Sequence, residues 1–503
     1  MDVRLPTCRK GYWIEPNDSH APTTTSERIR ARTAILTVLL LCGSRAFAQG
    51  APVSPDHPWH GVGEQRIEAD AKNFRESRFN TDPAKTYSLG ELIDVTETHN
   101  PETHFAWERA RAQAAALGVA RSELFPTLAA AALSETNREE TYLGTRFYRQ
   151  TFQDFQVALD LNYTVFDFGA RAGRIADARA EVLAANFVFN DTHRRVIYQV
   201  EQAYYQLLNA SGQEDAARAS LSNAQAVQQS VEERLNNGLA TLPDVLEARS
   251  ATAQAEYELQ AVLGSEEIAQ GNLATALGTS PTATIHVKTL MELPTPDSIG
   301  DSVDLAINRA LGQRPDLMRL VAEIRSSNAR VKEARAAYYP SLSVNVSPVA
   351  QSLYGLQQTL PWGHTAGLTG GLSLSLNWTV FDGGARKNNV VQAEANVRSA
   401  EAQVNAARDE IANQVWAAYS NLNTAFRQRQ AATALLDAAS QSYNSALESY
   451  NYGLRNFLDV TAAQRTLAQA RSTDVLARTQ VLIALADLAF RTGDSIQPAS
   501  TRP

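Results

Sequence analysis

Two segments of the chain alternate apolar and polar residues with a period of two. In the first, every second residue from Phe155 to Val165 is apolar, and the residues between them are mostly polar. The second segment repeats this alternation from Leu372 to Val380. A period of two places the apolar side chains on one face of a β-strand. Both segments have the length of a tilted membrane strand, which crosses a bilayer in about 9–11 residues.

Each segment has an upstream partner that begins directly after a proline. Pro126 precedes a short apolar stretch, and Pro340 precedes a stretch in which every second residue is apolar. Each pair of segments predicts one β-hairpin, over about 127–166 in the first half of the chain and about 341–381 in the second. A half-buried sheet in a soluble domain alternates in the same way, so the alternation alone leaves that interpretation open.

Polar stretches separate the two strands of each hairpin. They cover roughly 135–150 and 348–366, and we interpret them as surface loops. Tyr163 and Trp378 stand near the opposite strand ends, where aromatic side chains of membrane strands form a girdle at the lipid interface. Four strands cannot close a barrel, because the smallest bacterial barrels have about eight. Several copies would therefore have to contribute to one barrel.

A run of 68 residues from Ala385 to Tyr452 contains neither glycine nor proline. Good helix formers dominate it, and a continuous helix of this length would be roughly 100 Å long. Small or β-branched residues recur along it with the seven-residue spacing of coiled-coil packing: Val390, Val397, Val404 and Ile411, with Ala393, Ala400 and Ala407. A cytoplasmic filament would show the same heptads, but no filament explains the hairpins.

Glycine interrupts each long helical run at one point. Gly238 follows Asn237, and Gly453 follows Tyr452; a further amphipathic helix is predicted after each. Glycine just past a helix end tolerates the left-handed backbone that terminates a helix. Each half of the chain is therefore predicted to contain a helical hairpin whose turn lies at the far end from the β-hairpin.

Most of these features occur twice, at an offset of 215 residues. Asp167 and Asp382 lie in matching Phe-Asp-x-Gly-Ala-Arg sequences, where a strand meets a helix. A fixed internal period indicates one body built from two similar halves. The predicted organisation is an N-terminal extension with a signal peptide (1–48), an N-terminal arm (49–84), a first repeat (85–278) ending in a helix over 242–277, a linker (279–300), a second repeat (301–492) ending in a helix over 458–491, and a C-terminal tail (493–503).

The first 48 residues have the features of a secretory signal peptide. Three arginines precede a short apolar stretch, and Ala46-Phe-Ala48 ends it. A basic region, a short apolar stretch and an Ala-x-Ala site predict cleavage after Ala48. A lipoprotein signal would use Cys42 instead, but Leu41 stands where a small residue is normally needed.

Cysteine content and charge follow from that cleavage. Both cysteines, Cys8 and Cys42, lie in the segment that would be removed, so the mature chain would contain no thiol. The formal net charge of the whole chain is −8. Residues 1–48 contain seven Lys or Arg and four Asp or Glu, so the chain after Ala48 would carry −11. An acidic chain disfavours nucleic acid as a partner, because phosphate binding needs a basic surface.

The sequence contains none of the catalytic motifs that we sought. There is no Gly-rich phosphate loop, no His-Glu-x-x-His pair and no Gly-x-Ser-x-Gly elbow. The neighbouring histidines His57 and His60 have no further ligands in the sequence, so no metal site is predicted, and no catalytic or cofactor-binding residue is assigned. Asp167 and Asp382 are predicted to cap helices at the strand-to-helix corners, which also contain Gly169 and Gly384: they have a structural role and take no part in a reaction.

The ordered pair of motifs resembles the TolC-type outer-membrane efflux proteins (outer membrane factors) over about residues 85–492. The resemblance rests on the twin Phe-Asp-x-Gly-Ala-Arg corners, on Pro126 and Pro340, and on the two Gly-Leu helical tips. It implies a mixed α and β membrane protein: a homotrimer in which each chain contributes four transmembrane β-strands to a shared 12-stranded barrel, continued by a long periplasmic α-helical coiled-coil barrel. It also implies contact with outer-membrane lipid, a periplasmic adaptor (membrane fusion) protein and an inner-membrane pump as partners.

The resemblance also assigns roles at the helical tips. The Gly-Leu tips of the family meet the adaptor, and by position this role falls on Asn237, Gly238, Leu239, Tyr452, Gly453 and Leu454. Family members narrow the tunnel mouth with carboxylates after the second tip; Asp459 matches one such position, and Ala462 occupies the other. In the first repeat, Asp244 and Glu247 have that spacing. We expect Asp459, with Asp244 and Glu247, to form a constriction favouring cations. The alternative is that they are ordinary solvated charges or helix N-terminal acids.

The sequence therefore predicts a passive exit duct of a tripartite efflux or type I secretion system in the bacterial outer membrane, extending into the periplasm. A partner pump would supply energy, and the protein would not be an enzyme. Gating would come from the helical hairpins near 236–247 and 451–462. Drug, metal and protein cargo are all compatible with this duct. The alternative from another class is a non-channel coiled-coil scaffold or adaptor of the cell envelope.

Overall fold

The computed structural model describes residues 56, 63–73, 82, 85–143, 145–290, 302–357 and 363–494. The predicted signal peptide, most of the N-terminal arm, part of the linker and most of the C-terminal tail lie outside the described residues, as do His57 and His60. The chain divides into two compact units, Met1–Glu76 and Ser77–Pro503. In the first unit, the described helix is α2 (Glu64–Asn73).

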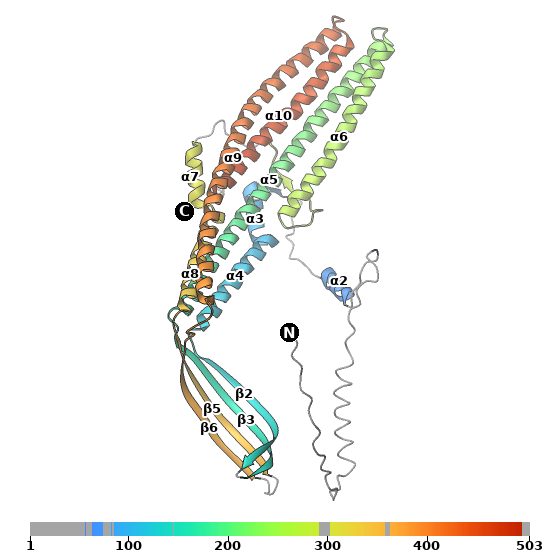
Figure 1. The fold of residues 1–503 in the computed structure, drawn as a ribbon. Helices are drawn as coiled ribbons and strands as arrows, with labels where there is room; N and C mark the ends of the chain where they lie inside the picture. Colours follow the sequence, from blue (N-terminus) through green and yellow to red (C-terminus); the bar gives the residue numbers. More distant parts are fainter. Residues whose placement is uncertain are drawn as a thin grey trace, which may run out of the picture. The chain divides into compact units, whose positions relative to one another are not determined.

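The second unit combines a four-stranded sheet with long helices that continue from it (Figure 1). The sheet contains β2 (Thr127–Leu143), β3 (Arg146–Phe166), β5 (Ser341–Gln357) and β6 (Gly363–Asn377). The helices are α3 (Leu89–His99), α4 (Pro101–Ser122), α5 (Ala170–Asn236), α6 (Leu242–Ala276), α7 (Val303–Gln313), α8 (Pro315–Ala336), α9 (Ala385–Asn451) and α10 (Phe457–Thr492). A small parallel pair joins β1 (Thr86–Tyr87) to β4 (His286–Val287). The predicted mixed α and β class is confirmed.

The large sheet is antiparallel throughout, in the order β2-β3-β5-β6. The first hairpin is β2–β3 and the second is β5–β6, so β2 and β6 form the two edges. Residues opposite one another across the strands share a face. One row across all four strands is entirely apolar: Leu128, Leu161, Val346 and Leu372. The alternation in the sequence therefore becomes one apolar face of the sheet.

The stretches interpreted as surface loops, roughly 135–150 and 348–366, are mostly strand, so that interpretation was wrong. β2 and β3 stay paired as far as Leu143 and Arg146, and β5 and β6 stay paired over most of the second stretch. A paired strand satisfies its backbone groups in water as well as in lipid. The change to polar residues therefore indicates a change of surroundings along each strand, and not its end.

Two helices of 67 residues each, α5 and α9, form the frame of the unit. The predicted helix over 385–452 is confirmed by α9, which ends at Asn451. At its far end each long helix turns back into a second helix, α6 or α10 (Figure 1). At the usual rise per residue, each long helix extends about 100 Å. Within the described parts of the chain, no helix combines the length and the apolar character needed to cross a membrane.

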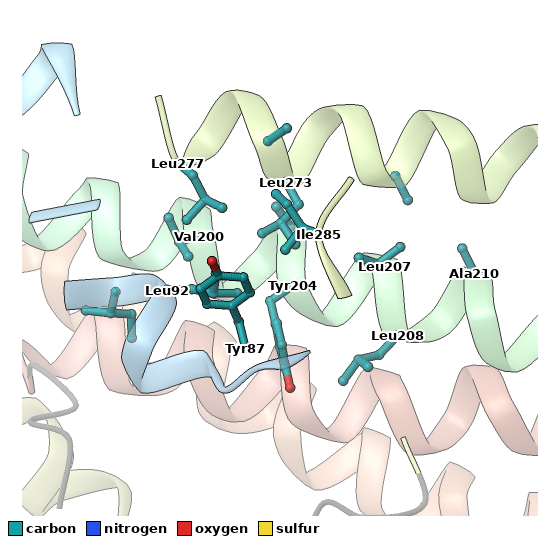
Figure 2. Packing of buried hydrophobic residues seen from close by; sticks show 14 of the residues in the cluster. Tyr87, Leu92, Val200, Tyr204, Leu207, Leu208, Ala210, Leu273, Leu277 and Ile285 are labelled. Atoms are coloured by element: carbon teal, nitrogen blue, oxygen red, sulfur yellow. The ribbon is translucent and has the colours of Figure 1, made fainter. Parts of the chain in front are cut away.

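The largest apolar cluster packs short elements against the middle of α5 (Figure 2). Tyr87 of β1 and Leu92 of α3 join Tyr204 of α5, and Leu277 and Ile285 after α6 complete the cluster. All five side chains are buried. Full burial of one such side chain contributes about 1.5–3 kcal/mol. The cluster therefore fixes the C-terminal end of α6 on α5 and leaves the opposite end of this hairpin projecting.

Candidate functional site

The repeated Phe-Asp-x-Gly-Ala-Arg sequence builds the corner where a strand becomes a helix. The carboxylate of Asp167 accepts hydrogen bonds from the backbone N–H groups of Gly169 (3.2 Å) and Arg171 (2.8 Å). The Arg171 side chain donates from Nε to the same carboxylate (3.0 Å) and from Nη2 to the carbonyl oxygen of Val165 (3.3 Å). The aspartate therefore caps α5, and the arginine connects its first turn to the end of β3.

The second corner repeats this arrangement at the start of α9. Asp382 accepts from the backbone N–H groups of Gly384 and Arg386, both at 3.0 Å, and from Arg386 Nε at 2.7 Å. Gly169 and Gly384 have φ angles of +97° and +90°, a conformation that glycine adopts without steric cost. Local structure thus accounts for the aspartate, glycine and arginine of the motif.

Replacing Asp167 with alanine is expected to lower the free energy of unfolding by about 1 kcal/mol, the usual cost of a lost helix cap. Burial alone would raise the pKa of Asp167, but the N–H groups of Arg171 and Gly169 and the Arg171 guanidinium outweigh burial and lower it. The cap is therefore fully effective above the unfolded-state pKa of about 3.9 and is lost as the pH falls through the folded-state pKa. Thermal unfolding in detergent at pH 7 measures the loss. The exposed Asp94→Ala variant is the control, and equal stability of the two variants would contradict the assignment.

Two tight turns close the helical hairpins at the end of the unit opposite the sheet (Figure 1). After α5, Gly238 has φ +74°, and the N–H of Leu239 donates to the carbonyl oxygen of Arg234 at 2.8 Å. The turn after α9 has the same geometry, with Gly453 at φ +74° and Leu454 as the donor at 2.8 Å. This is a Schellman motif, in which a left-handed glycine ends a helix and its last carbonyl groups are satisfied.

Large apolar side chains are exposed at both tips. Five of them are 60–80% exposed: Leu239, Leu242, Tyr452, Leu454 and Leu458. Of the predicted docking residues, Leu239, Tyr452 and Leu454 belong to this exposed set, while Asn237, Gly238 and Gly453 shape the turns. Clustered exposed apolar side chains are typical of interaction sites, so the tips are the candidate interaction surface.

The three carboxylates predicted at the constriction lie in or near the first turns of α6 and α10, and their partners differ. Asp244 completes a capping box, because its Oδ2 accepts from the backbone N–H (2.9 Å) and the hydroxyl (2.7 Å) of Thr241. Glu247 accepts from Nη2 of Arg465 at 2.9 Å. Among the described residues, no hydrogen bond or ion pair reaches the carboxylate of Asp459. Asp459 therefore has the freest of the three carboxylates.

Two arginines, which we call the tip latch, connect the first helical hairpin to the second. Arg234 of α5 donates from Nη1 to the carbonyl oxygen of Asn451 at the end of α9 (3.1 Å), and its guanidinium lies 4.7 Å from the centre of the Tyr450 ring. Arg465 of α10 forms the ion pair with Glu247 of α6. An apolar cluster from all four helices fills the space between the hairpins. Separation of the tips has to break the latch and expose this cluster.

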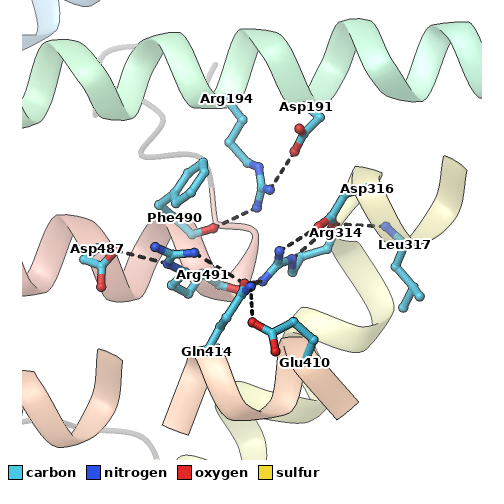
Figure 3. Close-up of polar contacts among 10 residues, drawn as sticks. All are labelled: Asp191, Arg194, Arg314, Asp316, Leu317, Glu410, Gln414, Asp487, Phe490 and Arg491. Carbon is cyan, nitrogen blue, oxygen red and sulfur yellow. Dashed lines mark hydrogen bonds and ion pairs between the residues drawn. The ribbon is translucent and has the colours of Figure 1, made fainter. Parts of the chain in front are cut away.

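A polar network fixes the other end of α10 (Figure 3). Arg194 of α5 donates to the carbonyl oxygen of Phe490 at 2.8 Å. Arg314, between α7 and α8, donates to the carbonyl oxygen of Arg491 at 3.4 Å and forms an ion pair with Asp316. Both arginine donors are buried, and cationic donors at the last carbonyl groups of a helix are favourable. This end of α10 is therefore held to α5 and α8, whereas its other end is held by the tip latch.

One buried carboxyl group in α5 has an unsatisfied oxygen. Glu201 is 3% exposed, and its Oε1 has no hydrogen-bond partner among the described residues. Burial raises its pKa to about 7. Tyr205, on the same helix, has its pKa raised by burial and then by the negative charge of Glu201. Glu201 therefore changes its charge near neutral pH.

Sequence reasoning did not identify Arg234, Arg465, Arg194, Arg314 or Glu201. A basic residue in the last turn of a helix favours the carbonyl groups there, which is a weak signal for Arg234. The sequence pattern contains no signal for the partners of the other four, because those partners belong to distant elements.

Comparison with known proteins places the chain in a class. Residues 92–279 and 306–494 match the family model described as outer membrane efflux protein. OprJ of Pseudomonas aeruginosa is 26% identical over 452 residues, which cover 87% of this chain and 89% of OprJ. CyaE of Bordetella pertussis is 29% identical over 402 residues, which cover 78% of this chain and 81% of CyaE. The solved structure of the outer-membrane channel OprN has a TM-score of 0.71 at 21% identity and covers 90% of this chain and 100% of OprN.

These matches define a class, the outer-membrane channels of efflux. The chain belongs to the outer membrane efflux protein family. The resemblance drawn from the sequence is confirmed, and so are the predicted place in the outer membrane and the absence of an enzymatic role.

Proposed function

We propose that the protein is the outer-membrane exit duct of a tripartite efflux or type I secretion system. The observation that carries the proposal is one chain that joins a sheet with an apolar face to helices of 67 residues ending in exposed apolar tips. The sheet suits passage through the outer membrane, and the helices are long enough to extend far into the periplasm. Conduction is passive, and an inner-membrane pump supplies the energy.

The proposed duct consists of three copies. One chain supplies four strands, and an open sheet edge in lipid leaves backbone groups unpaired. Three copies supply twelve strands, more than the roughly eight of the smallest closed barrels. The apolar face then contacts outer-membrane lipid, and the long helices of the three copies surround one periplasmic tunnel.

The helical tips are the proposed docking surface for a periplasmic adaptor. Leu239, Tyr452 and Leu454 offer exposed apolar surface at the end of the unit farthest from the sheet. An adaptor bound there would connect the duct to the inner-membrane pump. The tips also form the proposed gate, because the helical hairpins have to separate there before large cargo can enter.

Neutralising Asp459 is expected to reduce the cation preference of the pore. Three copies would place three of these carboxylates at the tunnel mouth, and rings of carboxylates favour cations. The reversal potential of single channels in a potassium chloride gradient measures the preference for wild type and Asp459→Asn. Asp244→Asn, at the equivalent position of the other repeat, is the matched comparison, and we expect a smaller shift because the Asp244 carboxylate serves in a helix cap. An unchanged reversal potential in Asp459→Asn would remove this residue from the constriction.

The oligomeric state tests the proposed duct against the alternative of an envelope scaffold. We expect membrane fractionation to place the protein in the outer membrane and light scattering in detergent to give the mass of three chains. A scaffold or adaptor would be extracted without detergent. A detergent-free, stable protein would contradict the duct.

A further inference from the structure

We propose that neighbouring copies join through the same contact that joins the two halves of one chain. In this contact β2 of one copy extends the sheet of the next copy at β6, in the register that β5 has on β3. The proposal rests on the proposed trimeric duct and deepens it, because it assigns the seam between two copies residue by residue.

The two β-hairpins share one register. Thr127 lies opposite Asn162 in the first hairpin, and Ser341 lies opposite Asn377 in the second. The first members of these pairs are 214 residues apart and the second members are 215 apart. The same two offsets therefore convert a position on β2 or β3 into the equivalent position on β5 or β6.

The internal junction between the hairpins gives the register of the seam. Leu161 of β3 lies opposite Val346 of β5. The offsets convert this pair into Leu376 of β6 and Ala132 of β2, which we place opposite each other in neighbouring copies. Both residues lie on the apolar face of the sheet, since Leu376 is opposite Leu342 and Ala132 is opposite Val157. A slip of one residue would put apolar side chains opposite the polar face.

The helix α4 has a free face that corresponds to a filled one on α8. The helix α8 packs against both α5 and α9, and its residues Ser326 and Ala329 are buried. The equivalent residues of α4 are Ala112 and Ala115, and both are exposed. Val119, further along the same face, is 71% exposed. The seam supplies a partner for this face.

The helix α9 has the complementary free face. Gly173 and Ala184 of α5 are buried on the side of that helix that meets α8. Their equivalents on α9, Asn388 and Ser399, are exposed. In the proposed seam, α4 of one copy lies along this face of α9 in the next.

The chemistry of the internal joint and of the seam differs. Between α5 and α8, Arg330 donates to Asp177 (3.0 Å) and to Glu181 (2.9 Å). The equivalent positions at the seam hold uncharged side chains: Ala116, Gln392 and Asn396. The joint within a chain is therefore ionic at this level, and the seam is neutral.

The helices also cannot approach each other equally closely in the two joints. A Cβ at Gly173 would lie 2.9 Å from the backbone nitrogen of Glu333, so the internal crossing requires glycine there. The seam has Asn388 and Val119 at these places, and α4 has to lie farther from α9 than α8 lies from α5. The strands, whose spacing is fixed by hydrogen bonds, are therefore the better place for a test.

Disulfide cross-linking tests the register. A chain with Cys8→Ser and Cys42→Ser has no thiol, and Ser134→Cys with Leu374→Cys places one thiol on each edge strand at positions predicted to meet. In one chain the two edge strands are three strand spacings, about 14 Å, apart, which exceeds the roughly 7 Å limit between the Cα atoms of a disulfide. Any disulfide between these positions therefore joins two copies. After oxidation, we expect a denaturing gel without reductant to show a ladder that stops at three chains.

Two displaced pairs are the matched controls. Leu374→Cys combined with Ala130→Cys or with Arg138→Cys keeps the thiols on the same face but moves them four residues along the strand, and we expect neither to cross-link. Cross-linking of a displaced pair in place of Ser134→Cys, in a protein with the mass and conductance of a trimer, would overturn the register and leave the duct intact. A protein that stays monomeric in detergent would overturn both.

Discussion

Removing both arginines of the tip latch is expected to open the tunnel mouth. In the Arg234→Ala/Arg465→Ala variant, the hydrogen bond to Asn451 and the ion pair with Glu247 are lost, while the apolar cluster between the hairpins remains. We expect a several-fold higher single-channel conductance than in wild type, because the helical hairpins separate more readily. Most of the effect should come from Arg234, since Arg465 is 71% exposed at its side chain and exposed ion pairs are weak.

Arg249→Ala is the matched control for the latch. Arg249 forms an ion pair with Glu232 at 2.9 Å, but this pair joins α6 to α5 inside the first hairpin. The control removes the same charge near the same tip without removing a connection between hairpins. We expect its conductance to stay close to that of wild type. An equal rise in the control would show that loss of positive charge, and not loss of the latch, increases the current.

Replacing Glu201 with glutamine is expected to remove much of the pH dependence of stability near neutral pH. Burial raises the pKa of Glu201 from 4.5 to about 7. A raised carboxyl pKa means that its contribution to stability is complete below the unfolded-state pKa and is lost as the pH rises through the folded-state pKa. The wild type should therefore lose stability between about pH 5 and pH 8, by up to about 3 kcal/mol per chain. Glutamine keeps the shape of the side chain and cannot become charged.

Denaturant unfolding in detergent at pH 5 and pH 8 measures this effect. We expect Glu201→Gln to be more stable than wild type at pH 8 and the difference to shrink toward pH 5. Glu266 adds a second contribution in the same range, because burial and its contact with Glu214 raise its pKa to about 7; the difference between variant and wild type isolates Glu201. Glu256→Gln, at an exposed position on α6, is the control. An unchanged slope in Glu201→Gln would show that this carboxyl is solvated in the folded protein.

The long helices and their turns could be predicted closely from the sequence, because helix formation and termination depend on neighbouring residues. A run without glycine or proline predicted a helix over 385–452, and α9 covers Ala385–Asn451. The corner aspartates were also interpreted from local pattern, and Asp167 bonds groups only two and four residues away.

Strand length and the contacts between hairpins could not be predicted in this way. β2 and β3 continue through polar residues because backbone pairing, and not side-chain polarity, defines a strand. Arg234 and its partner Asn451 are 217 residues apart in the sequence, and no local pattern identifies such a pair. Glu201 is one of many glutamates in helices, and only the packing around α5 sets it apart.

Single-channel recording in a planar bilayer tests the proposed duct most directly. The purified full-length protein, extracted in detergent, is added to the bilayer under a salt gradient. The account predicts stable conductance steps with a reversal potential that favours cations, from a protein with the mass of three chains. A correctly folded protein that carries no current under these conditions would contradict the duct and favour a non-channel scaffold of the envelope.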